Sequence, residues 1–388
     1  MIIRALQYIS NYNEVYRIFF SEREGLRMAV GMDGIRMELS RKAKQRPVPG
    51  ERLGFGQWFS DHMFVMDYEE GKGWHDPRIV PYGPFELDPA SMVFHYGQAV
   101  FEGMKAFRHR DGSIRLFRPG DNARRMNRSC ERMGIPTLDE DLFVEAVRRL
   151  VMADAEWVPS HPGSSLYIRP FVFATEPSLG VRMSTRYRFA VILSPVNGYF
   201  GDQAELRPIA IHVEDQYVRA VSGGTGEAKT PGNYAAGMIA QTAARQRRCD
   251  QVLWLDGVER TYAEEVGNMN VFFRLDDAVV TPALNGSILA GIMRDTAIQL
   301  LRKWGIPVEE RKVAISELAD AADKGRLKEA FGTGTAAVVC PIGRFIWNGT
   351  EFVAGQGTTG PVSRRLYEAI TGIQTGSIAD EFGWTVPV

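Results

Sequence analysis

Residues 195–203 divide the sequence into two halves with different patterns, and this break constrains the fold most strongly. They contain proline, asparagine and glycine residues, which are typical of a connection between folded units. Because a chain of 388 residues is longer than one hydrophobic core usually supports, we expect two domains. The sequence predicts a small domain over residues 51–195, a connection over 196–208 and a large domain over 209–388, with residues 1–50 unassigned.

The half before the break is rich in β-prone segments and contains one helical pattern. Residues 164–175 and 187–196 consist mainly of apolar, β-branched and aromatic residues, which favour strands. Residues 146–157 repeat apolar side chains every three or four positions, which is the spacing of an amphipathic helix. Either Asp139 or Asp141 is placed to cap the first turn of this helix.

The half after the break alternates short strands with helices. Strands are expected at residues 251–255, 270–274 and 278–281, and helices near residues 234–247 and 292–304. Helices and strands are therefore both expected in this half.

Composition excludes several classes of function. With 46 basic and 47 acidic residues the net charge is -1, which argues against general binding to nucleic acid or anionic lipid. Three scattered cysteines cannot form a disulfide framework, and the histidines lack the spacing of metal ligands. The apolar run at the N-terminus is interrupted by Asn11, Asn13 and Glu14 and is therefore too short to span a membrane. We expect a cytoplasmic protein without a metal.

A lysine and a glutamate in the second half could carry chemistry. Lys229 stands in a loop before a predicted helix, which Asn233 is placed to cap. Glu265 lies at the edge of an apolar strand, where a buried carboxylate would need a partner such as a pyridinium nitrogen. Considered alone, Lys229 could be an exposed surface charge, and Glu264 and Glu265 could be solvated acids at a strand end.

Two further segments could bind anions. Residues 284–294 form a loop that opens the helix predicted from Ile292, and the N–H groups of a helix start bind phosphate well. Residues 331–337 form a glycine–threonine loop that offers hydroxyl and backbone donors to a second anion. Considered alone, each could be an ordinary helix start or turn.

In this order the segments resemble the branched-chain aminotransferases of the class IV pyridoxal-phosphate fold, over residues 59–384. The resemblance also rests on five specific stretches: residues 95–107, 114–119, 122–125, 165–170 and 176–181. It implies a fold-type IV enzyme of the α+β class that uses pyridoxal 5'-phosphate. Such an enzyme has a smaller N-terminal α/β domain and a larger C-terminal domain, with the active site at their interface.

The resemblance assigns roles to the residues around the cofactor. Lys229 is expected to hold the cofactor as a Schiff base and then to move a proton at the substrate Cα. Glu265 is expected to face the pyridine nitrogen, and Tyr234 the phenolic oxygen. Four residues are expected to bind the phosphate: Arg125, Thr335, and Ile292 and Met293 through their backbone N–H groups.

The resemblance also implies a pocket that accepts both an apolar side chain and glutamate. Its expected apolar lining is Tyr96, Phe101, Tyr167 and Val181, with Tyr96 and Val181 contributed by the second subunit of a homodimer. Arg169 is expected to meet the glutamate γ-carboxylate, and the Ala336 N–H group the α-carboxylate. Asn268 stands where vertebrate members have threonine, so one α-carboxylate contact is expected to differ.

The implied reaction is reversible transfer of the amino group of L-leucine, L-isoleucine or L-valine to 2-oxoglutarate. The alternatives are a D-amino acid aminotransferase or an aminodeoxychorismate lyase, and a catalytically silent binding protein on the same fold. The pair Tyr167 and Arg169 favours the branched-chain enzymes. Vertebrate members also carry a Cys-x-x-Cys redox switch, whereas this chain has Ala337 and Cys340, so a thiol–disulfide switch is not expected.

Overall fold

The chain forms two compact units in a computed structural model that describes residues 17–20, 27–30, 34–48, 51, 53–198 and 206–388. The first unit comprises residues 1–197 and 382–388, and the second comprises residues 198–381. Residues 382–388 therefore belong to the first unit, not to the large domain in which the sequence places them. Residues 199–205 of the predicted connection, and much of the unassigned segment 1–50, lie outside the described residues.

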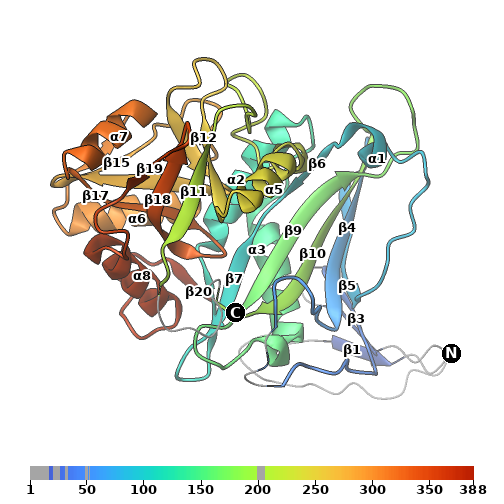
Figure 1. The fold of residues 1–388 in the computed structure, drawn as a ribbon. Coiled ribbons are helices and arrows are strands. Elements are labelled where there is room, and N and C mark those ends of the chain that lie inside the picture. Colours follow the sequence, from blue (N-terminus) through green and yellow to red (C-terminus); the bar gives the residue numbers. More distant parts are fainter. Residues whose placement is uncertain (1–16, 21–26, 31–33, 49–50, 52, 199–205) are drawn as a thin grey trace. The chain divides into compact units, whose positions relative to one another are not determined.

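The first unit is built on one large, mostly antiparallel sheet (Figure 1). Along the sheet its strands follow the order β1 (Arg17–Phe20), β2 (Arg27–Val30), β3 (Arg36–Leu39), β5 (Gly73–Pro81), β4 (His62–Glu69), β10 (Arg186–Val196), β9 (Ser165–Ala174), β7 (Met104–Arg108), β8 (Ile114–Phe117) and β20 (Thr385–Pro387). Strand β6 (Ala99–Phe101) pairs with β9. The C-terminal residues lie in this unit because β20 pairs antiparallel with β8.

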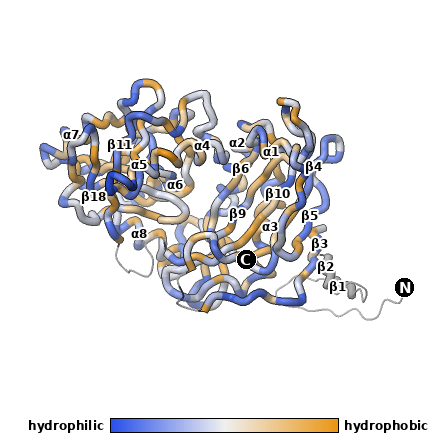
Figure 2. Tube along the Cα trace, turned by 45° about the vertical axis from the view of Figure 1, so that its right-hand side comes forward, coloured by the Kyte–Doolittle hydropathy of each residue, from blue (hydrophilic) through white to orange (hydrophobic). Residues whose placement is uncertain are grey.

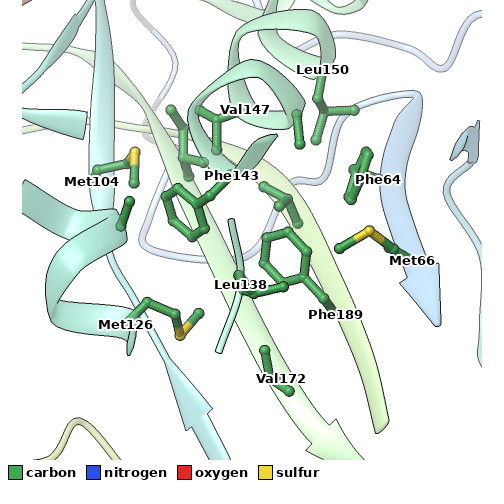
Figure 3. Packing of buried hydrophobic residues seen from close by; sticks show 14 of the residues in the cluster. Phe64, Met66, Met104, Met126, Leu138, Phe143, Val147, Leu150, Val172 and Phe189 are labelled. Carbon is green, nitrogen blue, oxygen red and sulfur yellow. The ribbon is translucent and has the colours of Figure 1, made fainter. Parts of the chain in front are cut away.

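Helix α3 (Glu140–Ala153) covers one face of this sheet, and helix α2 (Pro119–Arg132) packs against α3. A short helix, α1 (Met92–Tyr96), precedes β6. Figure 3 shows Phe143, Val147 and Leu150 of α3 packed among side chains of the strands. Their spacing by three and four positions places them on one helix face. Figure 2 shows hydrophobic residues concentrated along α3, β9 and β10. The helix starts and ends earlier than the predicted residues 146–157, and a 3₁₀ turn, Ala155–Trp157, follows it.

The start of α3 confirms one of the two predicted caps. Asp139 is the N-cap residue, and its Oδ1 accepts a hydrogen bond from the Leu142 N–H group at 2.8 Å. Asp141 lies inside the first turn, where its charge is favourable to the helix dipole.

The second unit is built on a sheet with the strand order β13 (Ala263–Val266), β12 (Gln251–Leu255), β11 (Ile209–Glu214), β18 (Val338–Trp347), β17 (Leu327–Gly334), β14 (Met269–Leu275), β15 (Ala278–Thr281) and β16 (Val308–Glu310). Strand β19 (Thr350–Val353) pairs with β18. Because β13 also pairs with β14, the strands from β13 to β14 in this order close into a ring around an apolar core.

Five helices of the second unit lie within the described residues: α4 (Pro231–Ala235), α5 (Met238–Gln246), α6 (Ile292–Lys303), α7 (Ile315–Asp323) and α8 (Pro361–Gln374). The strands expected at 251–255 and 278–281 are confirmed, and α6 ends one residue before its predicted end. The helical pattern near 234–247 is confirmed as two helices, because α4 ends at Ala235 and Gly237 is the N-cap of α5.

The predicted cap of α4 is wrong. Pro231 starts the helix and Thr230 is its N-cap, so Asn233 lies inside the helix. The Asn233 side chain instead donates to the carbonyl groups of Thr225 and Ala228, at 2.7 and 2.8 Å. It therefore holds the loop that carries Lys229.

In the described part of the chain, no helix has the length and apolar character needed to cross a membrane.

Candidate active site

The lysine loop of the second unit brings two predicted residues together. Lys229 lies two residues before α4 and is half-buried. Its Nζ donates a hydrogen bond to Tyr234 Oη at 2.7 Å. The amine and the phenol are thus held side by side, as is required if both are to meet the same molecule. The alternative that Lys229 is a fully exposed surface charge is wrong.

Glu265 is a buried carboxylate with two partners. It lies on β13 and is 4% exposed. Its Oε1 accepts from the Leu289 N–H group at 2.8 Å, and its Oε2 lies 3.2 Å from Arg219 Nε. Burial raises the pKa of Glu265, while Arg219, the Leu289 amide and Lys229 act in the opposite direction.

The interpretation of Glu264 and Glu265 as solvated acids is wrong, because both are buried. Glu264 Oε1 accepts hydrogen bonds from Asn285 Nδ2 at 3.0 Å and from Ser287 Oγ. The two neighbouring carboxylates therefore both hold the loop that leads to α6, from different positions along it.

A small cavity in the second unit lies beside Glu265. It is lined by Arg219, Ala228, Asn233, Tyr234, Glu265, Asn268, Asn270 and Leu289. Three predicted site residues, Tyr234, Glu265 and Asn268, therefore border one space, and Ala228 places the lysine loop at its edge. Asn268 is exposed in the turn between β13 and β14.

The start of α6 supplies backbone donors close to this cavity. Gly291 is the N-cap and has no side chain with which to cap the helix, and Ile292 and Met293 occupy the first two helical positions. Leu289, which borders the cavity, precedes the helix by three residues, and its carbonyl accepts from Asn270 Nδ2 at 2.9 Å. A Cβ atom at Gly291 would lie 1.9 Å from Asn270 Oδ1, so only glycine allows this close approach.

The glycine–threonine segment differs from its prediction. Residues 331–334 belong to β17, and only residues 335–337 form the turn to β18. Because Asn270 pairs with Thr333, this turn and Asn268 lie at the same end of neighbouring strands. Thr335 and Ala336, both partly buried, are therefore placed near the exposed edge of the cavity rather than in a long loop.

The first unit carries another group of predicted residues on a single sheet face. Phe101, Tyr167 and Arg169 lie on the face of β6 and β9 opposite the core. The Arg169 guanidinium carbon lies 4.9 Å from the Phe101 ring centroid and 5.3 Å from that of Tyr167. Arg169 Nη2 donates to Tyr167 Oη at 3.1 Å, while its buried Nε has no hydrogen-bond partner among the described residues.

Lys105 is a residue of this face that sequence reasoning missed. It pairs with Tyr167 across β7 and β9, and directly opposed residues point to the same side of a sheet. Its side chain is 7% exposed, and burial lowers the pKa of its amine to about 8. The available signal was a lysine between two apolar residues, Met104 and Ala106, inside a strand.

Arg125 lies on α2 and is held by a buried carboxylate. Its Nε and Nη2 donate to Glu102 Oε1 and Oε2, at 2.7 and 2.9 Å. Glu102 also accepts from Asn122 Nδ2 at 2.7 Å. The carboxylate thus fixes one edge of the guanidinium group, a role for Glu102 that the sequence did not reveal.

Tyr96 and Val181, predicted to serve a partner subunit, lie on the surface of the first unit. Val181 is 85% exposed and Tyr96 39%. Tyr96 Oη donates to the Leu179 carbonyl, so α1 and the segment around Leu179 adjoin. Leu179 and Met183, in the same segment as Val181, are also exposed apolar residues.

The chain is similar to known proteins over most of its length. Residues 99–345 match the family described as Amino-transferase class IV. "Branched-chain-amino-acid transaminase 1" of Bacillus subtilis (strain 168) is 57% identical over 345 residues, which cover 89% of this chain and 96% of that protein.

Two solved structures of the T.th. branched-chain amino acid aminotransferase share the fold. The one with pyridoxamine 5'-phosphate has a TM-score of 0.68 and 26% identity, covering 83% of this chain and 97% of that one. The one complexed with N-(5'-phosphopyridoxyl)-L-glutamate has a TM-score of 0.66 and 25% identity, over the same shares of both chains.

The chain therefore belongs to the class IV aminotransferases, whose pyridoxal 5'-phosphate cofactor suits the residues of the second unit. Within that family it groups with the branched-chain-amino-acid aminotransferases. The predicted α+β fold class, the enzyme class and the cofactor are confirmed. The cofactor fits because a buried carboxylate, a lysine paired with a tyrosine and a helix start with a glycine N-cap lie in one unit.

Proposed function

We propose that the enzyme catalyses reversible transfer of the amino group of L-leucine, L-isoleucine or L-valine to 2-oxoglutarate, giving branched-chain 2-oxo acids and L-glutamate. The observation that carries this proposal is the position of Arg169 against Phe101 and Tyr167. Aromatic rings accept an apolar side chain, and the guanidinium group accepts a carboxylate. One face can thus serve both substrates of the reaction.

The cofactor supplies an electron sink for the carbanion formed at the substrate Cα. In this proposal Lys229 Nζ attaches the cofactor and, once released, moves the proton at Cα. The hydrogen bond to Tyr234 Oη fixes where the amine stands. Glu265 faces the ring nitrogen, and its burial makes a proton-bearing partner favourable. Tyr234 donates to the phenolic oxygen.

The phosphate is held by a charged group and by backbone donors. We assign Arg125, Thr335, and the N–H groups of Ile292 and Met293 to this task. The first two positions of α6 favour an anion because the helix dipole adds to their hydrogen bonds. Glu102 accepts from Nε and Nη2 of Arg125 and so fixes the orientation of this buried guanidinium group, whose positive charge is suited to a phosphate.

Substrate selection follows from the same residues. Arg169 meets the glutamate γ-carboxylate, and Phe101 and Tyr167 line the side-chain pocket. The Ala336 N–H group binds the α-carboxylate. Asn268 borders the cavity beside Glu265, where its amide offers a different contact from the hydroxyl of a threonine.

We also propose that the enzyme acts as a cytoplasmic homodimer. The exposed apolar side chains of Tyr96, Leu179, Val181 and Met183 support this proposal, because contiguous apolar surface marks interaction sites. Tyr96 and Val181 would then complete the substrate pocket of the other subunit. Sedimentation of the wild-type enzyme and of Val181→Asp tests this assembly: the proposal requires a dimer that the variant weakens.

A panel of amino donors with 2-oxoglutarate tests the reaction itself. The holoenzyme is incubated with L-leucine, L-isoleucine, L-valine, L-aspartate and D-alanine, and glutamate and the 2-oxo acid are quantified. The three branched-chain donors are expected to give the highest kcat/KM, with one 2-oxo acid formed per glutamate. A preference for D-alanine would instead assign the chain to a D-amino acid aminotransferase. Lys229→Ala serves as the inactive control.

A further inference from the structure

Arg219 joins three segments of the candidate site. It follows β11, and its side chain is buried, with 7% exposed. Its Nε lies 3.2 Å from Glu265 Oε2. Its Nη2 donates to the Gly226 carbonyl at 3.3 Å and also to the Ser287 carbonyl. The carboxylate of β13, the lysine loop and the loop before α6 therefore share one guanidinium group.

The two loops that Arg219 joins are in direct contact. A Cβ atom at Gly226 would lie 2.1 Å from the Ser287 carbonyl oxygen, so a larger residue would force the loops apart. Gly226 precedes Lys229 by three residues, and Ser287 precedes Ile292 by five. The guanidinium group thus couples the attachment point of the cofactor to the helix start proposed to bind its phosphate.

The charge of Arg219 also bears on the protonation of Glu265. Burial alone favours the neutral carboxyl group, and the neighbouring Glu264 adds a like charge. Arg219 on Oε2 and the Leu289 N–H group on Oε1 favour the carboxylate. An arginine suits this position because its planar fork can serve several acceptors at once, whereas a lysine is a single point charge.

We propose that Arg219 is a positioning residue that keeps the Glu265 carboxylate ionised and aimed at the ring nitrogen, and that joins the lysine loop to the phosphate loop. The inference rests on the proposed function, in which Glu265 faces that nitrogen. With Arg219 in place, Glu265 is held as a carboxylate that would accept a hydrogen bond from a protonated ring nitrogen. Without the positive charge of Arg219, Glu265 would be favoured in its neutral form and would no longer hold that nitrogen protonated.

The protonation state of the ring nitrogen can be measured directly by nitrogen NMR. The holoenzyme is reconstituted with cofactor labelled with ¹⁵N in the ring, and the chemical shift of that nitrogen is compared among variants. Arg219→Gln removes the charge and leaves a polar amide on a shorter side chain. Arg219→Lys keeps the charge. Glu265→Gln removes the carboxylate, and Arg149→Met is a matched control that removes a buried arginine, paired with Glu145 on α3.

We expect the signal of Arg219→Gln to move toward that of an unprotonated ring nitrogen, and its leucine half-reaction to slow by about tenfold or more. Arg219→Lys should retain the protonated signal and recover part of the rate. Arg149→Met should match the wild type in chemical shift. If Arg219→Gln does not fold, Arg219→Ala with added guanidinium ion replaces it, and the ion should restore the protonated signal.

Two outcomes separate failure of this inference from failure of the proposed function. A wild-type signal in Arg219→Gln, or in Arg219→Ala without guanidinium, together with a shifted signal in Glu265→Gln overturns the role of Arg219 alone. An unchanged signal in Glu265→Gln shows that Glu265 does not face the ring nitrogen, and the proposed function then loses that assignment.

Discussion

The two units place their candidate charged groups in different surroundings. In the first unit, Arg169 is packed against two aromatic rings and, among the described residues, forms no ion pair with a carboxylate. In the second unit, Glu265 is paired with Arg219 and borders a cavity. A partly buried cation against aromatic rings is suited to an anionic ligand, whereas a buried carboxylate beside a cavity is suited to a group that carries a proton. The first arrangement fits substrate selection, and the second fits the cofactor.

Loss of Lys229 should abolish activity, which is the largest effect that the comparison predicts. Lys229→Ala removes both the attachment point and the base from a loop of the second unit, so every amino donor should be affected. Its folded structure should persist, because the side chain is only half-buried. Single-turnover kinetics and the visible absorbance of the bound cofactor measure these effects. Near-normal turnover with an unchanged absorbance band would show that another lysine does this work.

Loss of Glu265 should slow all donors alike. Glu265→Ala should still bind the cofactor, but its rate should fall on the order of 100-fold or more, since the ring nitrogen loses the partner that holds its proton. Leucine and glutamate half-reactions measured separately should show equal losses. An unchanged rate would show that another residue faces the ring nitrogen, and the neighbouring Glu264 would be the first candidate.

Lys105 gives the first unit a pH-dependent cost of folding. Its pKa is lowered to about 8 by burial, so the folded chain holds this proton less tightly than the unfolded chain. Below about pH 8 the full cost is present; between about 8 and 10.5 only the unfolded state stays protonated, so this contribution to stability rises with pH. Lys105→Met should therefore be more stable than the wild type at pH 7.

The expected difference for Lys105→Met is about 3 kcal/mol, because each pKa unit corresponds to about 1.36 kcal/mol. Urea unfolding of both proteins at pH 7 and at pH 10 measures it, and the difference should shrink at the higher pH. Equal stabilities at both values would contradict a buried, poorly solvated amine. If Lys105 also meets an anionic substrate group on the face shared with Tyr167, the stabilised variant should lose activity.

Loss of Arg169 should discriminate between substrates, in contrast to the variants of the second unit. A hydrogen bond to a charged group contributes about 1.5–3 kcal/mol, so Arg169→Met should lower kcat/KM for glutamate on the order of tenfold or more. Leucine makes no such bond and should change far less. An equal loss for both amino acids would mean that Arg169 stabilises the pocket or binds the substrate α-carboxylate. Substrate selection could then not be assigned to Arg169 of the first unit.

Mild oxidation should leave the enzyme's activity unchanged, so this is the smallest of the expected effects. Cys340 is fully buried, and burial raises the pKa of its thiol to about 12, so the reactive thiolate is scarce at neutral pH. Activity before and after dilute peroxide, in the wild type and in Cys340→Ser, provides the check. Reversible inactivation of the wild type that Cys340→Ser prevents would contradict this expectation.

Local patterns predicted the elements that depend on local interactions. The strands at 251–255 and 278–281 and the helix from Ile292 follow from apolar periodicity and the glycine at its end. The helical pattern near 234–247 did not reveal the break between α4 and α5, because Gly237 acts on the backbone at a single position and the pattern describes many residues together.

Buried charge networks could not be predicted because their members are far apart in the sequence. Nothing near Arg219 indicates that Glu265 is its partner, and nothing near Arg125 indicates Glu102. The roles assigned to Lys229, Glu265 and Arg169 came from ordered motifs, which identify individual residues but not their neighbours. The contacts that hold these residues in place form only when distant strands and loops are brought together.

The pairing of β20 with β8 affects the order in which the protein can be completed during translation. Domains generally fold from the N-terminus as the ribosome releases them. Here the first unit lacks an edge strand until residues 385–387 emerge, after the whole second unit has been synthesised. The β8 edge therefore stays unpaired throughout the synthesis of the second unit, and until residues 385–387 leave the ribosome it is available to chaperones or to another nascent chain.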